Sequence, residues 1–396
     1  MAGQSAYTAG SEVLHAYSQS FLQKATIHMG TTSTCLNSRG STRALRICTV
    51  ALIVMGCAST PWGLAAEAEQ TSLDFKVSGS QPVGGEGSWD YADYDSVHQR
   101  LFVARVGGVL VLDGGTLQPV GTVPALAGTR THGVTFAPDL GLGLTSNGSD
   151  ETSTVFNLGT LEPVRRIALG HSPDAIVYDP VSRRGVGLDG DDNVAVPFDP
   201  LSGSVSPALA LPGSPEGAAA DGRGHLYVNL SDRNEVAEID TRRWALEGHW
   251  SIGGGCEEPT PLAIDRGAMR LFIACRSGVL AIVDPVKRAL ITTVPIGKGA
   301  DAVAYEPKSR LIFVSCYDGT LTVVEAGSPA KYRVLETIKT APGARTLALD
   351  PVRLRVFLPV ADLGPVLPKV GSIPGRPAIV PATFRILTVS RSGLSR

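Results

Sequence analysis

Seven side chains recur at one position of a repeated motif, at intervals of 41 to 44 residues. Each follows a short polar turn and precedes a run of small apolar residues. Four carboxylates, one imidazole and one guanidinium gathered at one place could hold a divalent cation such as Ca²⁺ or Mg²⁺, bind a cationic or hydroxyl-rich ligand, or supply a general base. The alternative is a set of capped turn residues surrounded by water. The seven residues are Asp90, His132, Asp174, Glu216, Thr260, Asp301 and Arg345.

The segments that position these residues are short strands rich in β-branched and aromatic residues and bounded by Gly, Asp and Pro, for example 101–105, 226–229 and 311–315. Seven copies of a unit of about 40 to 45 residues with several strands each are typical of a β-propeller. The sequence therefore predicts an all-β fold, a single seven-bladed β-propeller of four-stranded blades over residues 72–392. The first strand of each blade lines the central channel, so the seven residues should face one another at one mouth. They are called the mouth ring below.

The last unit is one strand short, because only a few residues follow 383–389. A strand at 73–83 precedes the first unit and has the character of an outer strand. We expect it to complete the seventh blade, which closes the ring and removes an exposed sheet edge.

The run Leu226-Tyr227-Val228-Asn229, followed by 236–240, resembles the strand pair of the YVTN repeat. Segments 256–260, 270–275, 295–297, 301–303, 318–324 and 343–350 extend a similarity to exported YncE-like propellers. The resemblance implies a seven-bladed exported propeller. It implies no catalytic residues, because this family has no single agreed activity. Runs 141–144 and 185–188 depart from the pattern, and irregular second strands are expected there.

Six cysteines are present, and three of them precede the blades. Pairing the first two strands of blade five brings Cys256 to the same end as Cys275, and a disulfide between them would close a ring of 20 residues. Cys316 is then a lone buried thiol. A Cys275–Cys316 bond between blades is the competing arrangement.

The N-terminal segment 1–68 is predicted to be an extension with a secretory signal. Arginines 39, 43 and 46 precede an apolar core at 47–56 that is too short to span a bilayer. Two processing sites compete: cleavage after Ala68, or lipid attachment at Cys57. The predicted location is therefore the periplasm, with a lipoprotein anchored through Cys57 as the alternative.

Other polar residues flank the mouth ring by alignment, and a small-molecule cup could use them. They are Trp89, Arg130, His171 and Lys298. His98 and His225, in loops on the opposite face, and His249 are expected to be solvated surface residues. A Pro-rich insertion at 359–381 should emerge at the mouth as a lid, a partner-docking loop or a solvated excursion.

Formal net charge is −2, so no basic field favours nucleic acid as a partner. The sequence favours a monomeric binding scaffold for a small molecule or a periplasmic protein, with no assigned catalysis or cofactor and with a membrane reached only through the lipid anchor. The alternative is a metal-assisted lactonase or lyase that uses an ion held by carboxylates of the mouth ring, with His132 or His171 as acid or base.

Overall fold

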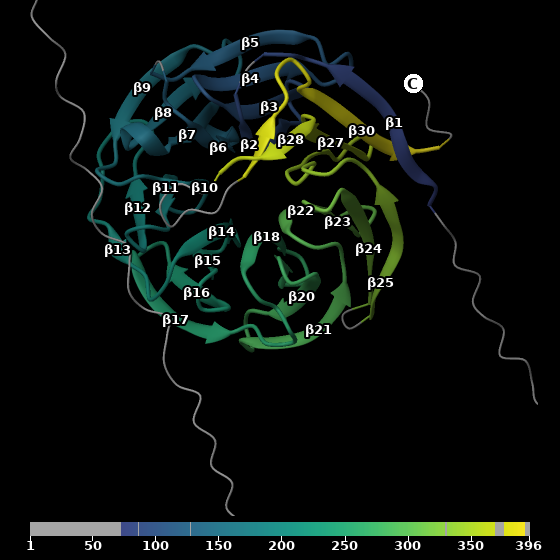
Figure 1. The fold of residues 1–396 in the computed structure, drawn as a ribbon. Helices are drawn as coiled ribbons and strands as arrows, with labels where there is room; N and C mark the ends of the chain where they lie inside the picture. Colours follow the sequence, from purple (N-terminus) through teal and green to yellow (C-terminus); the bar gives the residue numbers. More distant parts are fainter. Residues whose placement is uncertain (1–72, 86, 127, 329–330, 369–375, 393–396) are drawn as a thin grey trace, which may run out of the picture. The chain divides into compact units, whose positions relative to one another are not determined.

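The computed structural model describes residues 73–85, 87–126, 128–328, 331–368 and 376–392. Residues 70–367 and 377–396 form one compact unit, which is an all-β assembly of seven four-stranded antiparallel sheets arranged in a ring (Figure 1). The predicted seven-bladed propeller is confirmed. Residues 1–69 and 368–376 are grouped as a second unit. The predicted signal, with Cys57 and Ala68, lies outside the described residues. The described residues include no helix that is long and apolar enough to cross a membrane.

Each blade contributes one strand to each of four concentric positions (Figure 1). The inner strands are β2 (Trp89–Asp95), β6 (Thr131–Ala137), β10 (Ala175–Asp179), β14 (Pro215–Ala220), β18 (Pro259–Asp265), β22 (Ala300–Glu306) and β26 (Ala348–Asp350). The second strands are β3 (Arg100–Arg105), β7 (Leu142–Asn147), β11 (Arg184–Asp189), β15 (His225–Leu230), β19 (Arg270–Cys275), β23 (Leu311–Cys316) and β27 (Arg355–Val360). The third strands are β4 (Gly108–Asp113), β8 (Thr152–Asn157), β12 (Val194–Phe198), β16 (Glu235–Asp240), β20 (Val279–Asp284), β24 (Thr320–Ser328) and β30 (Arg385–Arg391). The outer strands are β5 (Pro119–Pro124), β9 (Pro163–Ala168), β13 (Leu209–Ala210), β17 (Ala245–Ser251), β21 (Ala289–Pro295), β25 (Lys331–Lys339) and β1 (Phe75–Pro82).

Burial follows these positions. In blade five, five consecutive residues of β19 are buried, because neighbouring blades cover both faces of the sheet. In β17, on the rim, exposed and partly buried residues alternate instead. Clusters of buried apolar residues lie between adjacent blades and hold them together, such as the one that joins Phe272 of blade five to Val314 of blade six.

The second strand of blade three pairs without interruption, so the expectation of irregularity was wrong there. In blade two, β7 keeps a single register with β8, but its pairing skips Thr145 and Ser146. The glycine positions of both strands stay paired because of a fit between glycine and phenylalanine. Gly143 on β7 pairs with Phe156 on β8, and a Cβ at Gly143 would lie 2.1 Å from the ring. Gly185 and Phe198 repeat this arrangement between β11 and β12, with a distance of 2.3 Å. The aromatic ring lies over the glycine and takes the place of the missing side chain, so the strand stays paired.

Ring closure depends on the first strand of the propeller. β1 pairs antiparallel with β30 and becomes the outer strand of blade seven, as predicted. Figure 1 shows the two chain ends of the propeller side by side in this blade. The Glu336 carboxylate on β25 accepts hydrogen bonds from the backbone N–H groups of Asp74 and Phe75. The ring of Phe75 meets Phe313 edge-on at 5.5 Å. Blade six therefore anchors the strand that completes blade seven.

A disulfide joins Cys256 and Cys275, as predicted, and Cys316 is a buried free thiol. Cys275 lies opposite Pro259 in the β18–β19 ladder, and a bulge follows this pair. The loop before β18 returns Cys256 to the same end of the blade, with the two Cα atoms 5.3 Å apart. The competing Cys275–Cys316 bond is therefore wrong.

The insertion in the last blade contains a small hairpin of β28 (Leu363–Val366) and β29 (Pro377–Ile379). Its first strand lies beside the mouth ring, because a Cβ added to Gly343 would meet the Leu363 side chain at 3.2 Å. Val366 and Leu367 are exposed, at 66% and 55%. The hairpin thus presents apolar side chains to solvent next to the mouth.

Replacing both cysteines of the disulfide with alanine should lower the free energy of unfolding by about 3 kcal/mol, because the cross-link closes a 20-residue ring and restricts the unfolded chain. Urea denaturation of the wild type and of Cys256→Ala/Cys275→Ala measures the difference. Reductant should destabilise the wild type and leave the double variant unchanged. Equal stability of the two proteins without reductant would contradict the prediction.

Candidate functional site

The mouth ring lies where the inner strands begin, and bulges set five of its members apart from the regular ladder. In blades one, two, four, five and six, the pairing of the inner strand with the second strand shifts register at the ring residue. A bulged residue is left unpaired, and its side chain is turned away from the regular pleat. The bulges therefore explain how these side chains can point along the ring instead of into a blade interface.

Side chains of neighbouring blades hold the backbone of the ring in place. A hydroxyl or amide of one blade donates a hydrogen bond to the carbonyl of a ring residue in the next blade. The donors are buried, so each bond replaces one to water and leaves few groups unsatisfied. The donor and acceptor pairs are Ser146 and Asp174 (2.9 Å), Asn229 and Thr260 (3.3 Å), Ser315 and Arg345 (2.6 Å), and Thr346 and Asp90 (3.0 Å).

Arg345 bridges the carboxylates on either side of it. Its Nη1 binds Asp301 Oδ2, and its Nη2 lies 3.5 Å from Asp90 Oδ1. Burial alone would lower the pKa of Arg345, but the two carboxylates raise it, so the guanidinium stays charged. Arg276 adds a contact to Asp301 at 3.2 Å, and Arg130 adds one to Asp90 at 3.0 Å. Both buried carboxylates are therefore neutralised by arginine.

His132 bridges a second pair of carboxylates. Its Nδ1 lies 3.1 Å from Asp90 Oδ2 and 2.8 Å from Asp174 Oδ1. Burial lowers the pKa of His132, but the hydrogen bonds to both carboxylates outweigh this effect and raise the pKa to about 9. The same contact lowers the pKa of Asp174. The imidazolium is therefore charged at neutral pH, and 59% of the Asp174 side chain is still exposed.

The Thr260 side chain makes hydrogen bonds that hold its neighbours in place. Its Oγ1 donates to the Glu258 carbonyl at 3.3 Å and accepts from Arg276 Nε at the same distance. It is 3% exposed. Thr260 thus helps to fix Arg276, which was not among the predicted residues.

Glu216 differs from the rest of the ring, because no described residue pairs with its carboxylate. The side chain is partly buried. Burial raises its pKa to about 7, and repulsion by Asp174 and Asp301 adds to the effect. Glu216 therefore holds its proton to a higher pH than an ordinary glutamate does.

Tyr91 is a second residue that the sequence did not single out. It follows Asp90 on β2, and burial raises its pKa well above the ordinary value, with further contributions from Asp301 and Glu216. Its hydroxyl therefore stays protonated among these carboxylates. Its signal in the sequence was its place directly beside a ring residue.

Arg276, at the turn after β19, could also have been found from the sequence, because that turn returns to the mouth.

The negative and positive groups of the mouth are equal in number, but the positive charge is unevenly distributed among the carboxylates. Four carboxylates face three guanidinium groups and one imidazolium, which leaves a formal sum of zero. The cations contact Asp90, Asp301 and the His132 side of Asp174. Glu216 and the exposed part of Asp174, on adjacent blades, are left with the smallest share of positive charge.

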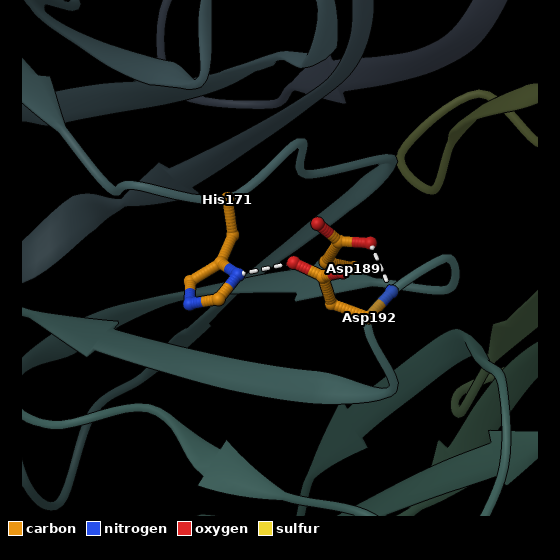
Figure 2. A group of neighbouring side chains, drawn as sticks. All are labelled: His171, Asp189 and Asp192. Atoms are coloured by element: carbon orange, nitrogen blue, oxygen red, sulfur yellow. Dashed lines mark hydrogen bonds and ion pairs between the residues drawn. The ribbon is translucent and has the colours of Figure 1, made fainter. Parts of the chain in front are cut away.

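The flanking candidates are only partly at the mouth. Trp89 is buried and packs against Phe384 at 5.5 Å, so it belongs to a blade interface. Lys298 donates to the Ser277 carbonyl. His171 Nδ1 lies 2.7 Å from Asp192 Oδ2, and Figure 2 shows the two side chains turned toward each other. Of the flanking candidates, only Arg130 pairs directly with the ring.

Two groups of side chains in the described ranges could bring three metal-ligating atoms together, and neither belongs to the mouth ring. They are His171 with Asp189 and Asp192, and His225 with Glu238 and Glu247. In the first group, drawn in Figure 2, Asp189 accepts backbone hydrogen bonds from Ser172, Asp191 and Asp192. That carboxylate therefore has a structural role in forming the turn.

Comparison with protein-family models finds no match for this chain, and no curated protein matches it.

The pH dependence of His132 offers a test of the site. NMR titration should give an imidazole pKa of about 9, and Asp174→Asn should lower it, because one hydrogen-bond acceptor loses its charge. Because folding raises the pKa of His132, its protonated form contributes to the free energy of folding. This contribution is fully present below pH 6.5, the ordinary pKa of histidine, and is lost as the pH rises through about 9. Asp192→Asn, beside His171, is the control and should leave the His132 titration unchanged. A wild-type value near 6.5 would contradict the assignment.

Proposed function

We propose that this protein is an exported β-propeller scaffold that binds a small cationic ligand at the mouth ring. The observation behind the proposal is the Glu216 carboxylate, which no described residue neutralises although the other carboxylates of the ring have cationic partners. A partly buried carboxylate without a partner costs folding free energy, and such a cost is common at binding sites.

The contacts of Arg345 indicate which kind of ligand group suits the ring. Arg345 places a cation with several N–H donors between two carboxylates of neighbouring blades. Glu216 and Asp174, on blades four and three, repel each other, and this repulsion contributes to the raised pKa of Glu216. A ligand ammonium or guanidinium group between them would relieve the repulsion and donate hydrogen bonds to the exposed carboxylate of Asp174.

Export is supported by independent features of the chain. The apolar segment and small-residue run before residue 69 have the pattern of a secretory signal. The Cys256–Cys275 disulfide suits an oxidising compartment. The resemblance of the second half to YncE-like propellers supports a periplasmic location.

The exposed hairpin side chains Val366 and Leu367 offer a surface for a protein partner beside the ligand.

The alternative of a metal-assisted lactonase or lyase is less favoured by the geometry. A divalent cation needs several oxygen ligands around one point. In the mouth, the Arg345 guanidinium already lies between Asp90 and Asp301. The described ring residues do not bring three ligand atoms within reach of one ion.

Binding of 1,4-diaminobutane tests the proposal. It should raise the melting temperature of the mature wild-type protein, and Glu216→Gln should abolish the shift. Affinity measured by calorimetry should rise between pH 6 and pH 8, because Glu216 loses its proton near pH 7. Without ligand, Glu216→Gln should be more stable than the wild type at pH 8, because the raised pKa means that the charged carboxylate opposes folding.

Glu162→Gln, an exposed carboxylate on the turn before β9, is the matched control and should leave binding unchanged. Glucose should bind more weakly than the diamine. Shifts with Ca²⁺ or Mg²⁺ that depend on Glu216 and exceed those of the diamine would favour the metal-dependent alternative. An equal response of Glu216→Gln and the wild type to the diamine would overturn the proposal.

Export has its own test. Intact mass of the protein recovered from a Gram-negative host should correspond to a chain that begins at Glu69, with no free thiol at Cys256 or Cys275. Cys57→Ala should be processed in the same way. A lipid-modified chain that begins at Cys57 would establish the lipoprotein alternative instead. A full-length reduced chain in the cytoplasm would contradict export.

A further inference from the structure

Three exposed arginines gather around the turn 221–224, which joins β14 to β15 at the end of blade four remote from the mouth ring. They are Arg223, Arg242 and Arg266. Among the described residues, no carboxylate lies within ion-pair distance of any of them. Most other charged residues on these turns are paired, such as Arg243 with Asp240. The cluster therefore holds three positive charges that the protein does not neutralise.

Backbone contacts place the three arginine side chains around one turn. Arg266 Nε donates to the Ala220 carbonyl at 2.9 Å, and Arg223 Nη2 donates to the Arg266 carbonyl at 2.9 Å. Arg242 lies against Gly224, where an added Cβ would be 1.8 Å from its Nη1. Gly224 has a φ of +109°, so glycine is needed there both for the backbone and for the close approach of the guanidinium.

A pocket of about 350 Å³ lies between blades four and five, and of the three arginines Arg223 lines it. Arg223 and His225 line one side of it, and Met269, Pro285 and Val286 supply apolar surface on the other. Tyr227 and Glu238 form its buried part. The pocket is thus a partly apolar concavity at the edge of a positive cluster.

The acidic groups of the pocket have partners inside the protein. Glu238 Oε2 accepts from Arg288 Nε at 3.1 Å and from Arg288 Nη2 at 2.8 Å, and Tyr227 donates to its other oxygen at 3.3 Å. Asp221 accepts from His225 Nδ1 at 3.0 Å and from the backbone N–H of Arg223. Glu238 belongs to the group with His225 and Glu247, and Glu247 pairs with Arg243, so the group is better explained by ion pairing than by a metal. The unpaired charge that faces a ligand is positive.

We infer that this pocket binds an organic anion, with a carboxylate or phosphate on Arg223 at the edge of the arginine cluster and an apolar body against Met269, Pro285 and Val286. Guanidinium groups bind both kinds of anion with paired N–H donors. The volume suits a body of about the size of one aromatic ring with its substituents. This site is separate from the mouth ring and does not depend on the function proposed for it.

Calorimetry with phenyl phosphate and benzoate tests the inference on the mature, disulfide-bonded protein at low salt. Arg223→Gln/Arg242→Gln should weaken binding of the better probe by roughly tenfold or more, because the charge-assisted contact of Arg223 in the pocket is lost together with a second positive charge on the same turn. Val286→Glu, at a position 76% exposed, should weaken it as well by placing a negative charge on the apolar wall. All variants should keep the wild-type melting temperature, since the replaced side chains are exposed. The ratio of the two affinities identifies the preferred anion.

Arg165→Gln is the matched control, because Arg165 is also exposed and donates to a carbonyl, that of Leu201 at 3.2 Å. Neither this variant nor Glu216→Gln should change binding of the anion. The inference is overturned if neither probe binds at 10 mM, if benzylamine binds as well as benzoate, or if Arg223→Gln/Arg242→Gln binds as the wild type does. Inorganic phosphate that binds as tightly as phenyl phosphate would overturn the role of the apolar wall.

Discussion

The pairing of β1 with β30 is the interaction on which the rest of the structure depends. A row of blades held together only by neighbours would leave blade seven one strand short and expose a sheet edge. Closure also brings blade seven against blade one, where the Thr346 hydroxyl binds the Asp90 carbonyl and Arg345 approaches the Asp90 carboxylate. The mouth ring therefore exists as a ring only because the first strand of the propeller joins its last blade.

In the closed ring, the pairing of charges determines which carboxylates of the mouth remain open to a ligand. Arg345 and His132 each connect ring carboxylates of neighbouring blades, so most of the mouth is stabilised internally. Glu216 is the position where this compensation stops. At the far end of blades four and five the imbalance is opposite, because Arg223, Arg242 and Arg266 have no carboxylate partner among the described residues and Arg223 lines the pocket there. The two binding sites that we propose thus lie at opposite ends of one scaffold and would take ligands of opposite charge.

The fold could be predicted because its causes are local and repeated. The spacing of the mouth ring residues expresses a constraint that every blade shares. The missing last strand and the position of Cys256, three residues before β18, follow from comparing single blades with that shared pattern. The same reasoning placed the seven side chains together, since register within a blade fixes which end of a strand they occupy.

Features that depend on contacts between blades could not be predicted in this way. The positions of Arg276 and Tyr91 in the repeat place both near the mouth, but which partners they meet there, Asp301 of the next blade for Arg276 and several carboxylates for Tyr91, is decided between blades. His225 was expected to be a solvated surface residue, yet it binds Asp221 and lines the pocket. Trp89 aligned with the mouth and is buried against Phe384, because the bulge in β2 separates the directions of adjacent side chains.

The glycines under Phe156 and Phe198 limit which substitutions this chain can accept during evolution. Any side chain at Gly143 would occupy the space of the Phe156 ring, and loss of that ring alone would leave a glycine strand with nothing covering it. Neither position can vary freely while the other is fixed. The two residues of each pair are thus expected to be inherited together, and related propellers should either have both or have replaced both with an ordinary pair of apolar residues.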